Sequence, residues 1–553
     1  MTVKNHNFFS AYQAIVIVTF VTLIGVYIYK MFSYKNIYIE KKRMQYIKKI
    51  VVSAPLKNIY DRNGEVLALS VPSYSYFLDT TLVKNENELQ EIARRFKYPV
   101  QKLIRKHRER KKFVWLVRKV SREIKHKFTG VFEVVEFLRI YPYRKLLSHI
   151  VGVRNKENEA LGGLELSLDS KLYGGKKVIK YMRGSDGKQF LIEDFSLPVY
   201  SNGGIMTTID IKLQRSLYEI ATEAYQRWKP ESLTAIAVEP EWGDIVAWVQ
   251  IPTFDPLKYN REPIKLMKNL ALTSPVEPGS LFKPFFYYML LKNNVIDEDR
   301  QVFCEKGHFK IRSRNIYDHT PRGFLSAKEV IAYSSNIGIT KLTQKLSQKD
   351  YIETLKTFRM LDRFSIGFVN TLKTKITPIN KWSYHTYISL PMGYEILTTP
   401  FHLIRGYSAF ANGGYLVNLS ILRDREKIKR KVLDSDVVSK VQNALRLVTK
   451  IGTGKRADSR LYILSGKTGT SKLLTQDKKY TSGKHRSFFI GFGPASLPRL
   501  VVYFQLDQPD GAYFGGTVAA PYVKEFIEKS LQKLFVEFEN SEVRNPLTQV
   551  KRE

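Results

Sequence analysis

Residues 207–228 carry hydrophobic side chains at the spacing of one face of an α-helix. The apolar positions of this face are Leu213, Leu217, Ile220, Ala221, Ala224 and Trp228. Asp210 stands just before the first of them, in the place of an N-cap residue. The stretch therefore predicts a helix that begins next to Asp210 and buries one face.

Two short apolar runs follow this helix, at 233–240 and 243–250, and each has the length of a buried strand. A matching pair lies near the end of the chain, at 487–494 and 499–507, before an amphipathic segment at 521–538. Strands and helices at both ends of a long helical insert predict an antiparallel sheet covered by helices. The fold class we expect is therefore α+β.

The N-terminal part of the chain gives weaker patterns. Residues 34–50 predict a basic helical stalk, and residues 85–130 also look helical and basic. Residues 59–70 predict a hairpin, because an Asn-Gly turn separates two short apolar runs. Residues 132–143 form a strand-like run that a proline interrupts. The Pro, Gly, Ser and Asn residues at 197–204 mark a domain junction.

A long apolar run covers residues 14–32, with Lys30 as its only charge. Its length is close to the roughly 20 residues that cross a bilayer. The run is longer than the core of a cleaved signal peptide, and no small-residue cleavage site follows it. We therefore expect an uncleaved single-pass anchor.

The composition adds a strong positive charge to this picture. The chain has 89 Lys and Arg residues against 52 Asp and Glu residues, a formal net charge of +37. Basic surfaces are the footprint of nucleic-acid binding, but the densest basic run, 105–112, lies in no recognisable reading motif. A general basic bias, or attraction to anionic lipid or cell-wall polymer, explains the charge equally well. The single cysteine, Cys304, excludes an internal disulfide and a cysteine-based zinc site.

The stretch "EPGSLFKPFFYYML" places Ser280 three residues before Lys283 at the start of an apolar segment of helical length. A serine at a helix N-terminus lies beside unpaired backbone N–H groups, which favour a developing oxyanion. A lysine at i+3 lies on the same helical face and can act as the base for the serine if it is kept neutral. The competing interpretation is an N-cap serine beside a solvated lysine. The same pattern at Ser185–Lys188 and Ser530–Lys533 shows that the motif alone decides nothing.

Two further motifs follow Ser280. Ser334 and Asn336 would place a hydroxyl and an amide on one loop face, where they could pass a proton and hold a carbonyl. An ordinary helix cap is the alternative, and Ser313–Asn315 has the same spacing. The third motif runs from Lys467 to Thr470 as Lys-Thr-Gly-Thr.

The Lys-Thr-Gly motif invites comparison with a phosphate-binding P-loop. The P-loop pattern requires glycine where Leu461 stands, so this interpretation is excluded. On a strand, Lys467 and Thr468 can instead bind a substrate carboxylate, and Gly469 lets a substrate backbone approach closely. The N–H group of Thr470 can complete an oxyanion hole with that of Ser280.

These three motifs, in this order, are the signature of active-site serine penicillin-recognising enzymes. The chain resembles a class B penicillin-binding protein, a membrane-anchored peptidoglycan D,D-transpeptidase. Segments 60–68, 139–152 and 161–174 are similar to the family's non-catalytic pedestal domain. In the catalytic part, "VEPGSLFKP", "MGYEILTTPFHLIRGYSAFANGG" and "LSGKTGTSK" are similar in wording as well as in spacing. The segments at 452–457 and 487–509 look most like the cell-division, FtsI-type, subgroup.

The resemblance implies the penicillin-binding transpeptidase fold, with a helical subdomain, an elongated pedestal domain and one transmembrane helix. The expected organisation is a cytoplasmic tail at 1–13, an anchor at 14–33, the pedestal at 34–200, the transpeptidase domain at 201–536 and a polar tail at 537–553. The segment 363–390 departs from the family pattern, and Leu281 replaces the commoner threonine. Both departures concern cleft shape and antibiotic affinity.

The resemblance also implies a mechanism. Ser280 attacks the penultimate D-Ala carbonyl of a stem pentapeptide, and Lys283 takes the hydroxyl proton. The terminal D-Ala leaves with a proton passed through Ser334. Its carboxylate is expected near Lys467, Thr468 and Thr470. An amine of a second stem peptide then attacks the acyl-enzyme. With a β-lactam in place of the donor peptide, the reaction stops at the acyl-enzyme. No metal or organic cofactor is implied.

The substrate of this family lies outside the cytoplasmic membrane, so we expect the catalytic domain there. The seven Lys and Arg residues at 30–49 favour the opposite orientation under the positive-inside rule. The expected partner is a multi-pass glycosyltransferase of the division machinery, and nucleic acid is not expected. The alternatives are a D,D-carboxypeptidase or β-lactam hydrolase on the same fold, a non-catalytic division scaffold, and an elongation-type transpeptidase.

Overall fold

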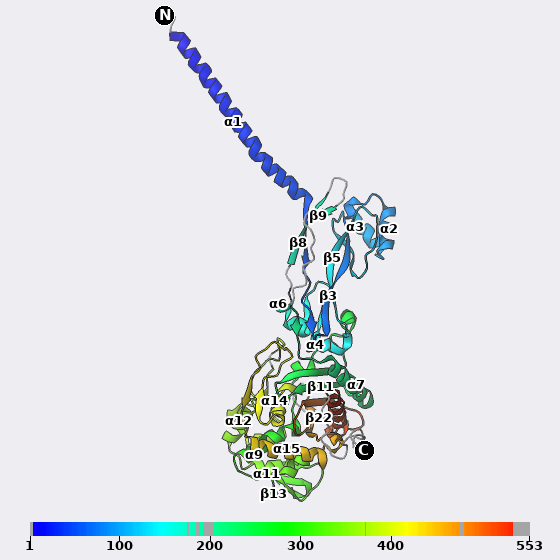
Figure 1. The fold of residues 1–553 in the computed structure, drawn as a ribbon, viewed down its shortest axis with the longest axis vertical. Coiled ribbons are helices and arrows are strands. Elements are labelled where there is room, and N and C mark those ends of the chain that lie inside the picture. The colour runs from blue at the N-terminus through cyan, green and yellow to red at the C-terminus, as the bar shows by residue number, and fades with distance from the viewer. Residues whose placement is uncertain are drawn as a thin grey trace, which may run out of the picture. The chain divides into compact units, whose positions relative to one another are not determined.

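The computed structural model describes residues 4–173, 176–183, 189–191, 203–370, 372–474 and 480–534 (Figure 1). The predicted junction at 200–201 and the polar tail at 537–553 lie outside these residues. Two compact units are formed by interleaved segments. Unit 1 contains residues 1–56, 70–138 and 173–202, and unit 2 contains 57–69, 139–172 and 203–553.

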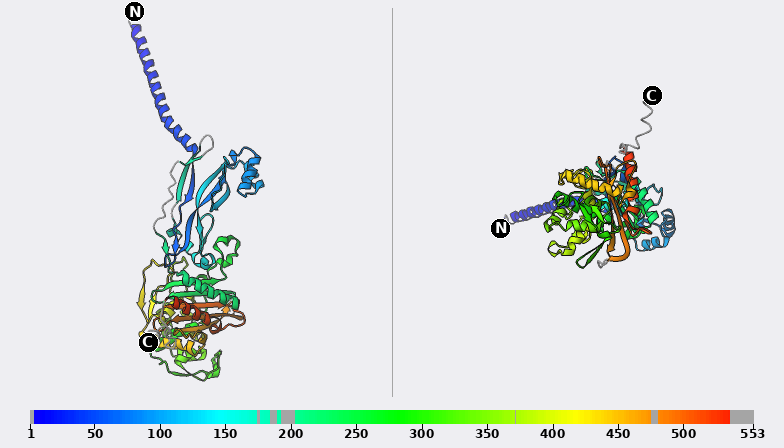
Figure 2. Two further views of the ribbon diagram at one scale, coloured as in Figure 1. Left: turned by 45° about the vertical axis from the view of Figure 1, so that its right-hand side comes forward. Right: turned by 90° about the horizontal axis from the view of Figure 1, so that it is seen from below.

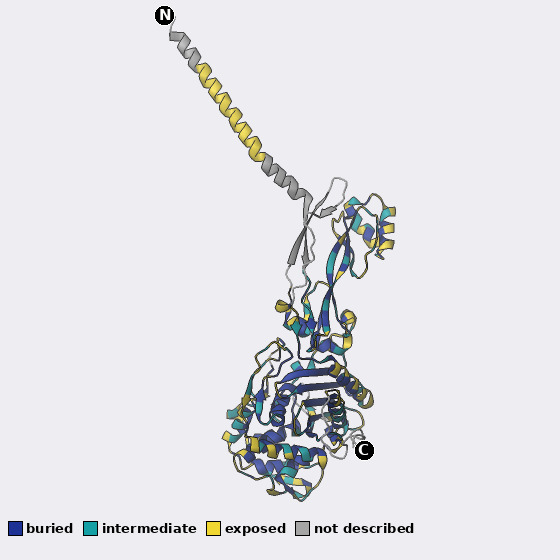
Figure 3. Ribbon diagram, in the orientation of Figure 1, coloured by how far each residue is buried: buried dark blue, intermediate teal, exposed yellow. Residues whose placement is uncertain are grey.

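Helix α1 (Lys4–Tyr46) contains the predicted anchor. Its segment Tyr12–Tyr34 is long and apolar enough to cross a membrane, and all of its side chains are exposed (Figure 3). An exposed apolar helix of this length is stable only where lipid or protein covers it. The helix ends before strand β1 (Ile47–Ser53), so the predicted stalk at 34–50 is helical only as far as Tyr46.

Unit 1 is built on residues 70–78 of the long strand β3 (Val66–Leu78), which pairs with β4 (Val114–Val120) and β5 (Val131–Ile140). Helices α2 (Glu86–Arg95) and α3 (Val100–Arg108) bury Leu89, Ile92 and Leu103 in a core shared with this sheet. The prediction of helix over 85–130 is therefore wrong beyond Arg108. Residues 114–117 are apolar, and their side chains are alternately buried and half-buried, which suits a strand that pairs with β3.

Unit 2 contains the predicted antiparallel sheet, in the order β12-β11-β23-β22-β21. The strands are β11 (Ser232–Glu239), β12 (Asp244–Ile251), β21 (Ser465–Leu474), β22 (Tyr480–Gly493) and β23 (Leu500–Asp507). Helices α7 (Ile211–Trp228) and α17 (Ala520–Lys533) pack together over one face (Figure 2). Asp210 caps α7 through Lys212 and Leu213, as the sequence predicts. The α+β prediction is confirmed.

The other face of the sheet packs against a helical subdomain with the hydrophobic helix α9 (Lys283–Lys292) inside it. Every residue of α9 except Lys292 is buried, because the helix is apolar on all sides. Around it lie α10 (Ala327–Ala332), α11 (Asn336–Thr343), α12 (Gln348–Thr357), α14 (Pro400–Ala411) and α15 (Ser435–Lys450). Lys283 is therefore carried into the interior as the first residue of a buried helix.

Segments from the N-terminal part of the chain belong to unit 2. Strand β2 (Ile59–Tyr60) pairs with β3 in the predicted hairpin and also pairs in parallel with β10 (Ile205–Met206). Nearby, Glu165 accepts hydrogen bonds from the side chains of Arg139 and Arg154, and all three are buried. The pairing of β2 with β10 links 57–69 to the part of unit 2 that begins at residue 203, and the Glu165 cluster holds 139–172 together within that unit.

Candidate active site

Ser280 lies in the short 3-10 turn η5 (Gly279–Phe282), which leads directly into α9. Two glycines allow other backbone segments to lie very close to this turn. Gly279 has a φ of +54°, and a Cβ atom there would lie 2.8 Å from the carbonyl oxygen of Thr470. Gly393 has a φ of +81°, and its Cβ would lie 2.1 Å from the carbonyl oxygen of Gly279. The serine is thus held where three backbone segments meet.

Lys283 is completely buried, and its ammonium group has several oxygen partners. Its Nζ donates to the backbone oxygen of Ser334 at 2.5 Å and to Oδ1 of Asn336 at 2.8 Å. The hydroxyl oxygen of Ser334 lies 3.3 Å away. Burial lowers the pKa of Lys283 to about 7, although the nearby Asp318 carboxylate acts in the opposite direction. A lysine with this pKa can be neutral near pH 7, which a general base requires.

Lys467, on strand β21, approaches Ser334 as well. Its Nζ donates to Ser334 Oγ at 2.8 Å and to the backbone oxygen of Thr468 at 3.1 Å. Burial, together with the positive charge of Lys283, holds the pKa of Lys467 well below its usual value. Ser334 has a φ of +58° in the turn between α10 and α11. Its hydroxyl group therefore bridges two buried lysines.

The direct contact between Ser280 and Lys283 that their spacing predicts is not made. Ser280 Oγ has no hydrogen-bond partner among the residues that the structure describes, because Lys283 Nζ is held by Ser334 and Asn336. Ser280 and Ser334 nevertheless line one cavity. Catalytic hydrogen bonds are often incomplete without substrate, so this geometry is compatible with a serine nucleophile.

The cavity has a volume of about 450 Å³ and collects most of the predicted residues. From the three motifs it is lined by Ser280, Ser334, Asn336, Thr468, Gly469 and Thr470. Thr468 Oγ1 shares a 2.6 Å hydrogen bond with Thr453 Oγ1. A Cβ at Gly469 would lie 2.9 Å from Cγ of Leu281, so this strand also packs closely on the serine turn. The three motifs, far apart in sequence, form one site.

Sequence reasoning missed Asp318, which organises the second motif. Its carboxylate accepts hydrogen bonds from Ser335 Oγ and from the backbone N–H of Asn336, both at 2.5 Å. A third comes from the N–H of Ile337 at 3.1 Å. The carboxylate thus caps the N-terminus of α11, where negative charge is favoured. Asp318 lies outside every local motif, so no signal in the sequence singles it out.

Sequence reasoning also missed the aromatic and basic walls of the cavity. His319 and Phe514 lie with ring centroids 4.1 Å apart, and Tyr333 and Tyr394 line the cavity too. Lys455 and Arg456 add positive charge. Among the described residues, no group of three or more His, Cys, Asp or Glu side chains is placed to hold a metal ion. The site brings the hydroxyl groups of Ser280 and Ser334 together with the buried amines of Lys283 and Lys467.

Comparison with known proteins gives the same picture. Residues 233–528 match the penicillin-binding protein transpeptidase domain, and residues 53–194 match the penicillin-binding protein dimerisation domain. The probable peptidoglycan D,D-transpeptidase PbpC of Pseudomonas aeruginosa is 30% identical over 496 residues, which cover 87% of each chain. The peptidoglycan D,D-transpeptidase FtsI of Escherichia coli is 27% identical over 489 residues, 85% of this chain and 82% of FtsI.

A solved structure shares the fold at lower sequence identity. A peptidoglycan synthetase from Bifidobacterium adolescentis superposes with a TM-score of 0.71 at 18% identity, over 89% of this chain and 98% of that one. The domain matches, the similarity to FtsI and the shared fold agree with the motif-based prediction. The chain belongs to the penicillin-binding protein transpeptidase family, as an FtsI-like class B member.

Proposed function

We propose that this chain is a membrane-anchored serine D,D-transpeptidase that cross-links peptidoglycan stem peptides during cell division. Family membership and relatives named as peptidoglycan D,D-transpeptidases support the reaction class. The observation that carries the proposal is the hydroxyl of Ser334, which is bonded by Lys467 and lies 3.3 Å from Lys283 Nζ. This group shares a cavity with Ser280, so a nucleophile, a base and a proton relay occur together.

In the proposed reaction, Ser280 Oγ attacks the carbonyl carbon of the penultimate D-Ala, and its proton passes to neutral Lys283. The new C–O bond makes an ester, and the amide bond to the terminal D-Ala breaks. The leaving amine takes its proton through Ser334. An amine of a second stem peptide then attacks the ester, forms the new amide and releases Ser280 with its proton restored. In this proposal, Thr468, Thr470 and Lys467 bind the carboxylate of the leaving residue.

In this proposal the catalytic domain spans 201–536, the non-catalytic domain spans 34–200, and the anchor in α1 holds both on the outer side of the membrane. The basic residues after the anchor favour the opposite side. We give the location of the substrate more weight than these residues, because basic residues occur throughout the chain and so say little about its orientation. A C-terminal reporter enzyme that is active only outside the cytoplasm is expected to be active, and an inactive reporter would refute this orientation.

The central test is covalent labelling of membranes with a fluorescent penicillin. The wild-type chain is expected to be labelled and the Ser280→Ala variant is not. Ser530→Ala is the matched control, because Ser530 has the same Ser-x-x-Lys spacing but lies buried in α17. An unlabelled wild type would refute the proposed enzymatic function. A labelled Ser280→Ala variant would refute the role of Ser280 as the nucleophile.

A second assay separates transfer from hydrolysis. The purified chain is supplied with a donor pentapeptide, with and without an amine acceptor. Cross-linked product that forms only with the acceptor is expected, whereas release of D-Ala without cross-linking would identify a D,D-carboxypeptidase. Co-purification with a multi-pass glycosyltransferase would support the proposed division partner.

A further inference from the structure

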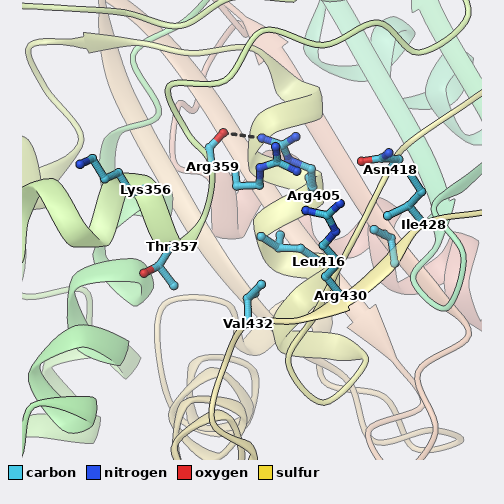
Figure 4. A pocket seen from close by; sticks show the side chains of 10 residues that line it. Lys356, Thr357, Arg359, Arg405, Leu416, Asn418, Ile428, Arg430 and Val432 are labelled. Carbon is cyan, nitrogen blue, oxygen red and sulfur yellow. Dashed lines mark hydrogen bonds between the residues drawn. The ribbon is translucent and has the colours of Figure 1, made fainter.

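A second cavity in unit 2, of about 320 Å³, has a strongly basic lining. It lies between the end of α12, helix α14 and the hairpin of β19 (Tyr415–Val417) and β20 (Lys429–Lys431). Its lining residues are Lys356, Thr357, Arg359, Arg405, Leu416, Val417, Asn418, Ile428, Arg430 and Val432 (Figure 4). Four of them are cationic and none is acidic. The lining shares no residue with the candidate active site.

Arg405 is the buried member of this cluster, with only 2% of its surface exposed. One of its terminal nitrogens donates to the backbone oxygen of Arg359, and its guanidinium carbon lies 4.2 Å from the ring centroid of Phe364. Its Nε has no hydrogen-bond partner in the described part of the chain. A buried charged group without full pairing is costly, so an anion here would be stabilised. Burial lowers the pKa of Arg405 to about 10; the Asp362 carboxylate opposes this shift, and the charge of Arg359 adds to it.

Arg359 adds a second guanidinium group whose charge acts on Arg405, and Figure 4 shows the side chains of Arg359, Arg405 and Arg430 among those that line the cavity. Arg359 is paired with Asp362 at 2.5 Å. Within the described residues, Arg430 and Lys356 have no carboxylate partner. The cluster therefore holds more positive charge than its own side chains neutralise.

The other basic residues of the hairpin show that Arg430 is not simply one more surface cation. Lys429 pairs with Glu241 at 2.5 Å, and Lys431 donates to the backbone oxygen of Gly413 at 2.5 Å. Both also lie over the ring of Tyr415. Alternate residues of a strand face opposite sides, so Arg430 points away from these partners and lines the cavity.

We propose that this cavity binds a phosphoryl group, either as free phosphate or as a phosphate ester. A phosphate monoester carries close to two negative charges and three acceptor oxygens, which matches three guanidinium groups and an ammonium group better than a carboxylate does. Planar guanidinium groups bind such oxygens in pairs. The volume leaves room for a small organic portion. This inference is independent of the proposed catalytic function.

The test uses the full chain in detergent micelles at constant ionic strength. Inorganic phosphate, glycerol phosphate and the diester bis(glycerol) phosphate are titrated by calorimetry, with acetate as the carboxylate comparison. Saturable binding of at least one phosphoryl probe, and none of acetate, is expected. Binding of the monoester alone would indicate a small dianionic ligand, and equal binding of the diester would indicate a phosphodiester polymer or lipid headgroup.

Arg430→Gln is the main variant, because Arg430 is exposed and its loss leaves the core intact. One lost charge-assisted contact predicts binding weaker by about tenfold or more. Arg499→Gln is the matched control, since Arg499 is exposed and lies outside the cavity lining. The circular dichroism spectrum is expected to be unchanged in both variants, which verifies folding. Unchanged phosphate affinity in Arg430→Gln, or equal binding of acetate and phosphate, would overturn the proposal.

Discussion

Lys467 Nζ donates a 2.8 Å hydrogen bond to the hydroxyl oxygen of Ser334. The same oxygen lies 3.3 Å from Lys283 Nζ, and both lysines are fully buried. Two ammonium groups so close in a low-dielectric interior repel each other, which favours a neutral amine on one of them. The Ser334 hydroxyl can then donate to the neutral amine while it accepts from the charged one. Proton transfer between the lysines through Ser334 requires no large movement.

Replacing Ser334 with alanine should break this relay while leaving both lysines in place. Because proton transfer by a positioned group contributes about 10²–10⁴ in rate, acylation by a fluorescent penicillin should slow by roughly that factor. Ser313→Ala is the matched control: Ser313 has the same Ser-x-Asn spacing but is exposed and outside the cavity lining. Acylation of Ser334→Ala at the wild-type rate would exclude Ser334 from the mechanism.

The pH dependence of acylation should follow Lys283. Its pKa is lowered to about 7, so the amine is protonated below pH 7 and neutral above it. The second-order rate constant should therefore rise with pH, by about tenfold per unit on the acidic side, and level off above pH 7. The measurement is acylation by a β-lactam from pH 5 to 9, with circular dichroism to verify folding. A rate that falls between pH 6 and 8 would contradict a neutral Lys283 base.

Asp318 offers a second test of this pH dependence. Its negative charge raises the pKa of Lys283, so Asp318→Asn should move the midpoint of the profile to lower pH. Loss of the charged cap on α11 should also slow acylation. Asp434→Asn is the control, because Asp434 likewise caps a helix, α15, through two backbone N–H groups. If the midpoint does not shift in Asp318→Asn, and both variants lose a similar amount of stability, Asp318 serves only as a structural cap of α11.

Local patterns were sufficient to predict the sheet, helix α7 and the three motifs. Strands β11, β12 and β23 are buried, mainly apolar runs, and α7 has a clear cap at Asp210, so each of these elements could be recognised in its own segment. The motifs could be recognised because each is compact in sequence. Strand β4 was missed because basic residues surround it and its pairing with β3 is not local.

The features that sequence reasoning missed depend on contacts between distant segments. Asp318 acquires its role only when its loop meets the start of α11. The inclusion of 57–69 in unit 2 rests on the pairing of Ile59 with Ile205 and on the 2.6 Å ion pair between Arg62 and Glu239. Neither pattern is visible in a window of sequence. The bonding of Lys283 to Ser334 and Asn336 instead of Ser280 is likewise a property of the folded interior.

Gly393→Ala should displace the serine turn. A Cβ there would lie 2.1 Å from the carbonyl oxygen of Gly279, so the backbone beside Ser280 must move. Since a misplacement of about 1 Å can cost 10²-fold in rate, acylation should fall by roughly that factor. Gly413→Ala separates backbone strain from steric contact. Gly413 also has a positive φ, +78°, but a Cβ there would meet nothing within 4 Å. Equal acylation rates in the two variants would show that the Gly393 contact does not position Ser280.

The stability of unit 2 should depend on Glu165. Its carboxylate has 0% of its side chain exposed and holds Arg139 at 2.6 Å together with Arg154. Glu165→Gln keeps the shape but removes the buried negative charge that lies between two guanidinium groups, of which Arg154 keeps its pair with Asp169 at 2.6 Å. This loss should cost about 3–5 kcal/mol of unfolding free energy. Glu241→Gln is the control, because its pair with Lys429 is 53% exposed on the glutamate side and should contribute about 1 kcal/mol or less. Both variants are compared with wild type by denaturant unfolding. A loss in Glu165→Gln no larger than in Glu241→Gln would mean that the arginines find other partners or water. In that case the buried cluster would not be what holds residues 139–172 together.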